Sequence, residues 1–172
     1  LLTLARADAG RIQLHLVELD LGQLVEETCS LLQPLAFEKQ VVIVQRMVFV
    51  FVFGDRDRLS EAIANLLANA IQYNDSGGRV DVSLQVNGMH AELRISDTGR
   101  GIPEADRQAI FERFYRVDEA RSQAVGGSGL GLAITKWIID SHGGSIEYEA
   151  GARGGAIFIV KLLDSRQTVL PH

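Results

Sequence analysis

The spacing of apolar residues along the 172-residue chain predicts three longer helices. The first follows Asp20, a suitable N-cap, and reaches about Glu38; the second runs from Asp55 to about Asn74. The third spans about residues 129–142. We expect the first helix to bury Leu21, Leu24, Val25, Thr28, Leu31 and Leu32, and the second to bury Leu59, Ile63, Leu66, Leu67, Ala70 and Ile71.

Shorter segments with alternating or continuous apolar residues predict strands. They cover residues 14–19, 41–45, 48–53, 80–86, 91–95, 145–149 and 156–162. Residues 47–53 consist of Met, Val and Phe, and we expect a buried strand there. Asn87-Gly88 predicts a tight hairpin turn with positive φ at both central residues.

The order of these elements predicts an α/β fold. Because helices and strands are mixed without regular βαβ alternation, we expect a two-layer α/β sandwich. Its mixed, mostly antiparallel sheet would be covered on one face by about three helices. Pro103 suits the first turn of a short helix reaching about Ile110, and residues 111–128 predict a mobile loop. The tail after Asp164 is expected to fray.

Composition and charge restrict the class of protein. With 47% hydrophobic residues, the chain can bury the core of one domain. The formal net charge of −5 leaves no diffuse basic surface, so nucleic acid is not an expected partner. The single cysteine, Cys29, is expected to be a buried, inert thiol. The longest apolar run is too short to span a bilayer, but the chain begins abruptly in helical register, which favours a fragment with an anchor upstream.

Asn65 and Asn69 lie four residues apart in the second predicted helix, so their side chains share one face beside the apolar stripe. A neutral amide oxygen can complete the octahedral coordination of a Mg²⁺ ion whose charge is already balanced by phosphates. The alternative is that both amides only hydrogen-bond to neighbouring backbone, which is the commoner situation for an isolated pair.

Asp97 follows an apolar strand and precedes Thr98-Gly99-Arg100-Gly101. Its carboxylate can accept a hydrogen bond from the exocyclic amine of adenine, which would select ATP over GTP. Gly99 and Gly101 allow the backbone to approach the base closely. A strand-ending turn without any ligand would use the same residue types.

Gly127, Gly129 and Gly131 lead into the third predicted helix, whose N-terminal amides would favour phosphate. A hinge followed by a tightly packed glycine is the alternative, and a loop that closes over a nucleotide can need both. The cluster has neither the lysine of a P-loop nor the last glycine of a dinucleotide fingerprint, so both of those sites are excluded.

Four segments follow one another in a fixed order. They are Asn65-Leu66-Leu67-Ala68-Asn69-Ala70, Asp97-Thr98-Gly99-Arg100-Gly101-Ile102, Phe111-Glu112-Arg113-Phe114-Tyr115-Arg116 and the segment from Gly127 to Leu132. As a set they resemble the N box, first glycine box, F box and second glycine box of the catalytic ATP-binding domain of sensor histidine kinases, in the superfamily shared with gyrase, Hsp90 and MutL. Residues 1–11 resemble the end of that family's dimerisation helix.

The resemblance implies a role for each matching residue. Asn69 would be the principal Mg²⁺ ligand, with Asn65 close to the metal or its waters. Asp97 would bind adenine, Tyr73 would line the nucleotide cleft, and Arg116 in a mobile ATP lid would approach the γ-phosphate. The glycines expected to surround the nucleotide are Gly99, Gly101, Gly127, Gly129 and Gly131.

Two features of the chain depart from relatives in this superfamily. Gln72 stands where sensor kinases commonly have lysine, so one positive charge facing the phosphates is missing. Asn65 stands where the hydrolytic relatives have a glutamate general base. Because an amide cannot take a proton from water, efficient ATP hydrolysis is not expected.

Phe111 and Phe114 are expected to anchor the lid by packing.

The resemblance also implies the organisation of a longer protein. Residues 1–12 would end a dimerisation-domain helix, residues 13–164 would form the catalytic domain, and residues 165–172 would be a tail. The domain would bind Mg·ATP and deliver the γ-phosphate to a histidine on the absent dimerisation domain of a homodimer, for relay to a response regulator. The fragment itself would lie outside the membrane, as the cytoplasmic domain of an inner-membrane sensor.

Three alternatives stay open. The domain could be a degenerate nucleotide-binding module without kinase activity, a stand-alone ATPase of the gyrase type, or a serine kinase of the anti-sigma type.

Overall fold

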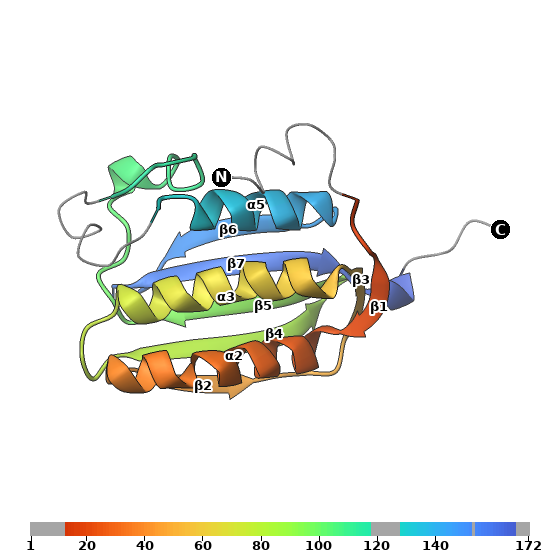
Figure 1. Cartoon of the computed structure of the whole chain (residues 1–172), viewed down its shortest axis with the longest axis horizontal. Helices are drawn as coiled ribbons and strands as arrows, with labels where there is room; N and C mark the ends of the chain where they lie inside the picture. Colours follow the sequence, from red (N-terminus) through yellow and green to blue (C-terminus); the bar gives the residue numbers. More distant parts are fainter. Residues whose placement is uncertain (1–12, 118–127, 153, 168–172) are drawn as a thin grey trace.

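The computed structural model describes residues 13–117, 128–152 and 154–167. Within them, a five-stranded sheet is covered on one face by three α-helices (Figure 1). The strands in spatial order are β2 (Val42–Arg46), β4 (Arg79–Asn87), β5 (His90–Asp97), β7 (Ala156–Leu163) and β6 (Ser145–Ala150). The helices are α2 (Leu21–Glu38), α3 (Arg56–Gln72) and α5 (Gly131–Ser141). Because β2 and β4 pair in parallel and the other neighbours pair antiparallel, the predicted two-layer sandwich is confirmed.

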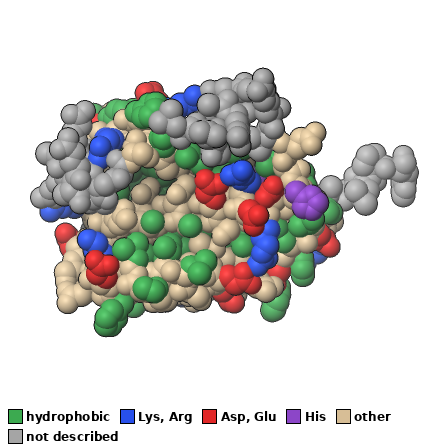
Figure 2. Space-filling view, in the orientation of Figure 1, with side chains coloured by type: hydrophobic (Ala, Val, Ile, Leu, Met, Phe, Trp, Pro, Cys, Tyr) green, Lys and Arg blue, Asp and Glu red, His purple; other side chains and the backbone are tan. Residues whose placement is uncertain are grey.

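The helix α3 lies between α2 and α5 and forms the centre of the core (Figure 1). Its whole predicted apolar stripe is buried. On α2, the prediction is wrong for Leu31, which is 74% exposed; Ala36 is buried although it was not predicted, and Cys29 is buried as expected. Position 31 lies on the side of α2 that faces away from the sheet, and hydrophobic side chains are visible in the surface over this helix (Figure 2). Burial, assisted by the charge of Glu26, raises the pKa of the Cys29 thiol to about 11, as expected for an inert cysteine.

A second, two-stranded sheet closes one end of the helix layer. It pairs β1 (Val17–Asp20) with β3 (Phe51–Gly54), and Leu19 lies opposite Val52. The expectation of a buried strand at residues 47–53 holds only in part, because β3 begins at Phe51 and only alternate side chains turn inward. Val50 and Val52 are buried, whereas Phe49 is 85% exposed and its neighbours Phe51 and Phe53 also face solvent.

The hairpin between β4 and β5 has a different register from the predicted one. Asn87 pairs with His90, so the two central residues of the turn are Gly88 and Met89. Only Gly88 of these two has a positive φ, at 62°. The Asn87 side chain donates to Glu92 across the hairpin at 3.0 Å, and this contact is part of the register that forms.

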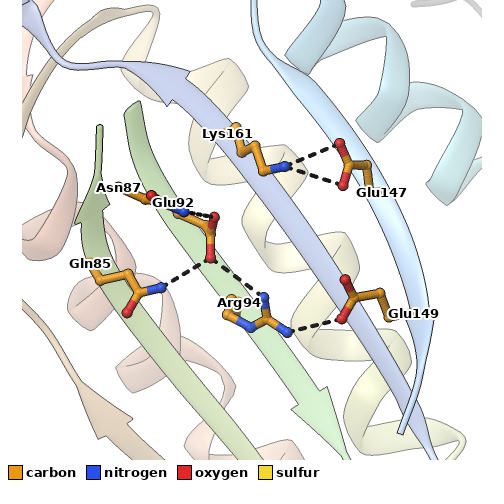
Figure 3. A network of polar contacts seen from close by, with 7 residues as sticks. All are labelled: Gln85, Asn87, Glu92, Arg94, Glu147, Glu149 and Lys161. Atoms are coloured by element: carbon orange, nitrogen blue, oxygen red, sulfur yellow. Dashed lines mark hydrogen bonds and ion pairs between the residues drawn. The ribbon is translucent and has the colours of Figure 1, made fainter. Parts of the chain in front are cut away.

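Polar side chains cover the face of the sheet that points away from the helices. Glu92 is only 4% exposed there and accepts hydrogen bonds from Gln85 and Asn87, each at 3.0 Å. Arg94 lies 3.4 Å from Glu92 and 3.0 Å from Glu149 on β6. The full network comprises Gln85, Asn87, Glu92, Arg94, Glu147, Glu149 and Lys161 (Figure 3). The network supplies hydrogen-bond partners to the buried carboxylate of Glu92 and gives this face of the sheet a polar surface that can contact water.

Two shorter segments also differ from their predictions. In place of a helix from Pro103 to Ile110, the 3-10 helix η1 (Glu104–Asp106) is followed by turns. Pro103 precedes η1 with an extended backbone, and no side chain caps its start. The expected fraying after Asp164 is wrong for its first residues, which form the 3-10 helix η2 (Ser165–Gln167).

The start of η2 is fixed to the small sheet. Ser165 is buried, and its hydroxyl donates to Glu18 at 2.8 Å. The proposed tail beyond residue 167, and the proposed end of a dimerisation helix at residues 1–12, lie outside the described residues. Among the residues that the structure describes, none of the helices has the length and apolarity needed to cross a membrane.

Candidate functional site

The two asparagines of α3 lie where this helix passes the beginning of α5. The two helices run antiparallel and side by side (Figure 1). Asn65 donates from Nδ2 to the carbonyl oxygen of Gly131, the first residue of α5, at 3.4 Å. This orientation leaves the Asn65 Oδ1 oxygen without a hydrogen bond in the described part of the chain. Asn69 follows one turn later, and both side chains are half-buried.

Asp97 is the last residue of β5 and is 9% exposed. Its Oδ1 oxygen accepts two backbone hydrogen bonds, from Gly99 at 2.8 Å and from Ala156 at 3.2 Å. Burial raises the pKa of this carboxyl group, although the two backbone donors act in the opposite direction. Among the described residues, Oδ2 has no hydrogen-bond donor. Asp97 therefore has one oxygen that is fixed by the fold and one that is available to a ligand.

Glycines surround Asp97 at distances that exclude a side chain. A Cβ atom on Gly99 would lie 2.5 Å from the carbonyl oxygen of Tyr73. A Cβ atom on Gly101, where φ is +69°, would lie 2.7 Å from the carbonyl oxygen of Gly155. The backbone at these glycines does make close contacts, as predicted, but the contacts are with other backbone segments of this chain.

The β6–β7 connection also contributes to this site, which was not predicted from the sequence. A Cβ atom on Gly155 would lie 2.0 Å from the carbonyl oxygen of Asp97, and Gly155 has a φ of +82°. The next residue, Ala156, supplies one of the two N–H groups that hold Asp97. The signal was Gly154-Gly155 directly before the last apolar strand, since paired glycines at a strand start indicate close backbone contact.

The start of α5 presents backbone N–H groups without a side-chain cap. Leu130 occupies the N-cap position and caps nothing with its side chain. Gly129, with a φ of +70°, precedes it and accepts a hydrogen bond from the N–H of Phe114 at 2.9 Å. The first N–H groups of a helix have no partner within the helix and carry its positive dipole end. This terminus is therefore suited to phosphate, and Asn65 lies beside it. Gly127 lies outside the described residues.

Residues 111–117 form turns that adjoin this terminus. Phe111 packs edge-to-face against Phe158, with ring centroids 6.3 Å apart, as expected for an anchor. The same expectation is wrong for Phe114, which is 59% exposed. Its φ of +64° belongs to the turn that meets Gly129, so this residue is held by its backbone and its ring faces solvent.

Arg116, Tyr73 and Gln72 complete the set of predicted residues. Arg116 is half-buried, and its Nη2 atom is buried without a hydrogen-bond partner in the described part of the chain. Tyr73 caps the end of α3 and is about half exposed, and Gln72 is half-buried next to it. A buried guanidinium nitrogen without a partner in the described residues, next to Gly129 ahead of α5, suits an anionic ligand.

These donors and acceptors fit a magnesium nucleotide. Neutral amide oxygens on α3 suit Mg²⁺ that also binds phosphate oxygens, and helix N–H groups with an unpaired arginine suit the phosphates. The available oxygen of Asp97 suits an amine on the base. The structure brings together Asn65, Gly131, Gly129 and the segment at Phe114 by direct contact, and it joins Asp97, Gly99, Gly101 and Tyr73 in a second group. The helix α3 carries Asn65 in one group and leads directly into Tyr73 in the other.

Known proteins resemble the chain in both sequence and structure. Among curated proteins, the histidine-protein kinase/phosphatase MprB of Mycobacterium sp. strain KMS is 41% identical over 160 residues, which cover 90% of this chain and 29% of MprB. The sensor-like histidine kinase SenX3 of Mycolicibacterium smegmatis is 37% identical over 163 residues, covering 94% of this chain and 42% of SenX3. The chain thus spans between about a fifth and two fifths of the length of the curated relatives it matches.

Solved structures of similar proteins have the same fold. The mycobacterial sensor histidine kinase MprB superposes with a TM-score of 0.76 at 31% identity, covering 87% of this chain and 97% of the MprB chain. Full-length ShkA in complex with AMPPNP superposes with a TM-score of 0.80 at 28% identity, covering 94% of this chain and 34% of ShkA. The family model of histidine kinase-, DNA gyrase B- and HSP90-like ATPases matches residues 54–166. The resemblance to sensor histidine kinases is confirmed, and the chain belongs to this ATPase family.

Proposed function

We propose that this chain is the catalytic part of a sensor histidine kinase that binds Mg·ATP and transfers the γ-phosphate to a histidine on a dimerisation domain outside the chain. One observation carries the proposal. The side-chain amide of Asn65 on α3 lies 3.4 Å from the carbonyl oxygen of Gly131 at the start of α5, so a possible metal ligand lies beside possible phosphate donors. The similarity to ShkA, which was solved with AMPPNP, supports a nucleotide as the ligand.

Each residue of the site has a proposed task. Asn69 and Asn65 supply neutral oxygen to Mg²⁺, which neutralises charge on the phosphates when bound. Asp97 accepts from the adenine amine with Oδ2, and Tyr73 lies beside the base. Arg116 binds the terminal phosphate. The backbone around the nucleotide is supplied by Gly99, Gly101, Gly127, Gly129 and Gly131.

The proposed chemistry is positioning and charge neutralisation. A ring nitrogen of the acceptor histidine forms a bond to the γ-phosphorus while the bond from that phosphorus to the β–γ bridging oxygen breaks, and ADP leaves with that oxygen. The residues of this chain hold the γ-phosphate in line and offset its charge, and they form no covalent intermediate. The phosphoryl group would next pass to an aspartate of a response regulator.

The gyrase type of activity is the second candidate, and the site disfavours it. Asn65 occupies the position of the general base in those enzymes, and its Nδ2 is engaged with Gly131. A neutral amide cannot deprotonate water, so the domain alone should release phosphate slowly.

We propose that the full protein is a homodimer with the chain on the cytoplasmic side of the inner membrane, where the response regulator is found.

Phosphate transfer to a separate dimerisation domain tests the proposal. The chain is mixed with the purified dimerisation domain of its full-length protein and ATP labelled at the γ-phosphate, with and without Mg²⁺. Label that is lost in acid and kept in base identifies phosphohistidine and is the expected result. Acid-stable label on serine would identify a serine kinase, rapid release of free phosphate by the chain alone would identify an ATPase, and no nucleotide binding at all would leave a degenerate module.

A further inference from the structure

His142 joins the ends of two helices at the side of the domain opposite to the candidate site. It follows the last residue of α5, and its Nε2 atom lies 2.9 Å from the backbone nitrogen of Asp55, the N-cap residue of α3. Its Nδ1 atom lies 2.7 Å from the carbonyl oxygen of Ile138. The ring therefore spans the gap between the end of α5 and the beginning of α3.

The two partners of the ring determine its protonation state. A backbone N–H only donates, so Nε2 must carry a lone pair toward Asp55. A carbonyl oxygen only accepts, so Nδ1 must carry the hydrogen toward Ile138. The structure assigns His142 as a neutral imidazole with its proton on Nδ1. A proton added to Nε2 would place two N–H groups against each other.

The position of this contact gives it a consequence at the candidate site. Along α3, Asp55 lies ten residues before Asn65, and along α5, Gly131 lies eleven residues before His142. At 1.5 Å per residue, each pair is separated by about 15 Å along its helix. The antiparallel helices α3 and α5 are therefore joined by two contacts, Asn65 with Gly131 and Asp55 with His142. These two contacts lie about the same distance apart along α3 as along α5.

We propose that His142 is a positioning residue for Mg·ATP, acting by fixing the axial register of α3 against α5. Asn69 and Asn65 are carried by α3, while the phosphate-type donors are carried by the start of α5. A shift of one helix along the other would separate them. Asp97 lies on β5 and is held by Gly99 and Ala156, so such a shift would leave it in place. This inference rests on the proposed nucleotide function.

Asp55 connects the same junction to the segment that enters the domain. Its Oδ1 oxygen accepts from the N–H of Arg58 at 3.2 Å, as an N-cap does, and its Oδ2 oxygen accepts from the N–H of His15 at 3.0 Å. Burial raises the pKa of Asp55, but the backbone hydrogen bonds from His15 and Arg58 and the charge of Arg58 outweigh this and lower it. The carboxylate therefore stays ionised at neutral pH and holds residues ahead of β1 against the start of α3.

The first test is the tautomer of His142 in the wild-type chain. Two-dimensional NMR that correlates ring carbon-bound hydrogens with both ring nitrogens distinguishes the two neutral forms. We expect a protonated Nδ1 and an unprotonated Nε2 at pH 7.5. A proton on Nε2, or rapid averaging of the two forms as in a solvent-exposed histidine, would overturn the assignment. This readout needs no substitution and no nucleotide.

The second test separates positioning from general structural support. His142→Phe keeps a ring but leaves the N–H of Asp55 without an acceptor, whereas His142→Gln retains an oxygen acceptor near the Nε2 position. His90→Gln on β5 is the matched control. Calorimetry measures the dissociation constants of Mg·AMPPNP and of adenosine, which has no phosphate.

For His142→Phe we expect about three- to tenfold weaker binding of Mg·AMPPNP, because a partly buried N–H loses its acceptor, with adenosine binding unchanged within about twofold. His142→Gln should recover most of the loss. Equal weakening of both ligands, or unchanged binding of Mg·AMPPNP, would refute the positioning role. A wild-type chain that binds neither ligand would instead refute the proposed function and remove the basis of this inference.

Discussion

Replacement of Asp97 by asparagine tests the assignment of its two oxygens. In the wild type, Oδ1 is occupied by the N–H groups of Gly99 and Ala156, at 2.8 and 3.2 Å. In Asp97→Asn, the amide oxygen can keep both of these bonds, because a carbonyl oxygen accepts as a carboxylate oxygen does. The NH₂ group must then replace Oδ2 and face the ligand. The variant therefore changes an acceptor into a donor at the proposed position of the adenine amine.

The magnitude follows from this exchange. A hydrogen bond to a charged group contributes about 1.5–3 kcal/mol, and two opposed donors add a further unfavourable term, so we expect a loss of about 2–4 kcal/mol in ATP binding. At 1.4 kcal/mol per factor of ten, this is about 30- to 1,000-fold in the dissociation constant. Hypoxanthine carries a carbonyl oxygen where adenine carries its amine, so the inosine nucleotide should respond in the opposite direction and bind the variant better than the wild type.

The assay is calorimetric titration of wild-type and Asp97→Asn chains with Mg·AMPPNP and with Mg·ITP, together with urea unfolding. We expect the preference between the two nucleotides to invert and the free energy of unfolding to change by less than about 1 kcal/mol, since Oδ1 keeps its backbone donors. Equal weakening of both nucleotides, or an unchanged preference for AMPPNP, would refute the reasoning. A large loss of stability would show that the amide had turned its NH₂ group toward Gly99.

Three further predictions concern the metal, the backbone contact and the buried acid. Asn69→Ala should weaken ADP binding about 5- to 30-fold in Mg²⁺ and by less than about twofold in EDTA, measured by calorimetry; equal effects in both buffers would exclude a metal ligand. Gly155→Ala should destabilise the chain by about 2–4 kcal/mol in urea unfolding, because a Cβ atom would lie 2.0 Å from the carbonyl oxygen of Asp97. Gly77→Ala is its control, since Gly77 has a similar φ of +80° with no atom within 4 Å, and a loss as large in this control would contradict the contact argument. The hydrogen bond from Asn87 is the main cause that lowers the pKa of Glu92 below its ordinary 4.5. The stability contributed by ionised Glu92 should therefore be present above pH 4.5 and be lost as the pH falls through the lowered pKa. Glu92→Gln should accordingly lose less unfolding free energy between pH 5 and 3 than the wild type. An identical loss in both proteins would contradict this account.

Local periodicity predicted the parts of the fold in which one face of an element meets the core. The stripe of α3 was predicted in full because its apolar residues keep helical spacing for more than three turns. The run at residues 47–53 offered no such contrast between faces, so the sequence alone did not show that Phe49 would point to solvent and Val50 to the core. The turn after β4 was misplaced by one residue because its register depends on the pairing of Asn87 with His90 and on the contact of Asn87 with Glu92, which turn propensity does not include.

Candidate site residues could be proposed from the sequence where the chemistry depends on a residue type at a fixed local spacing. Asn65 and Asp97 were proposed in this way, and the structure adds which of their atoms are engaged. Gly155 was missed because its requirement for glycine comes from the carbonyl oxygen of Asp97, 58 positions earlier in the chain. The packing role given to Phe114 was wrong for a similar reason, because its positive φ is set by a contact with Gly129. Contacts between distant segments decide such positions, and no local pattern records them.

The central claim is that the asparagine pair, Asp97 and the glycine segments bind one magnesium nucleotide together. Amide NMR of the wild-type chain during titration with Mg·AMPPNP tests it most directly. The side-chain amides of Asn65 and Asn69 and the backbone amides of Gly99 and Gly129 should shift along one binding curve with a single dissociation constant. Shifts confined to one group, or two groups that saturate at different nucleotide concentrations, would contradict the account.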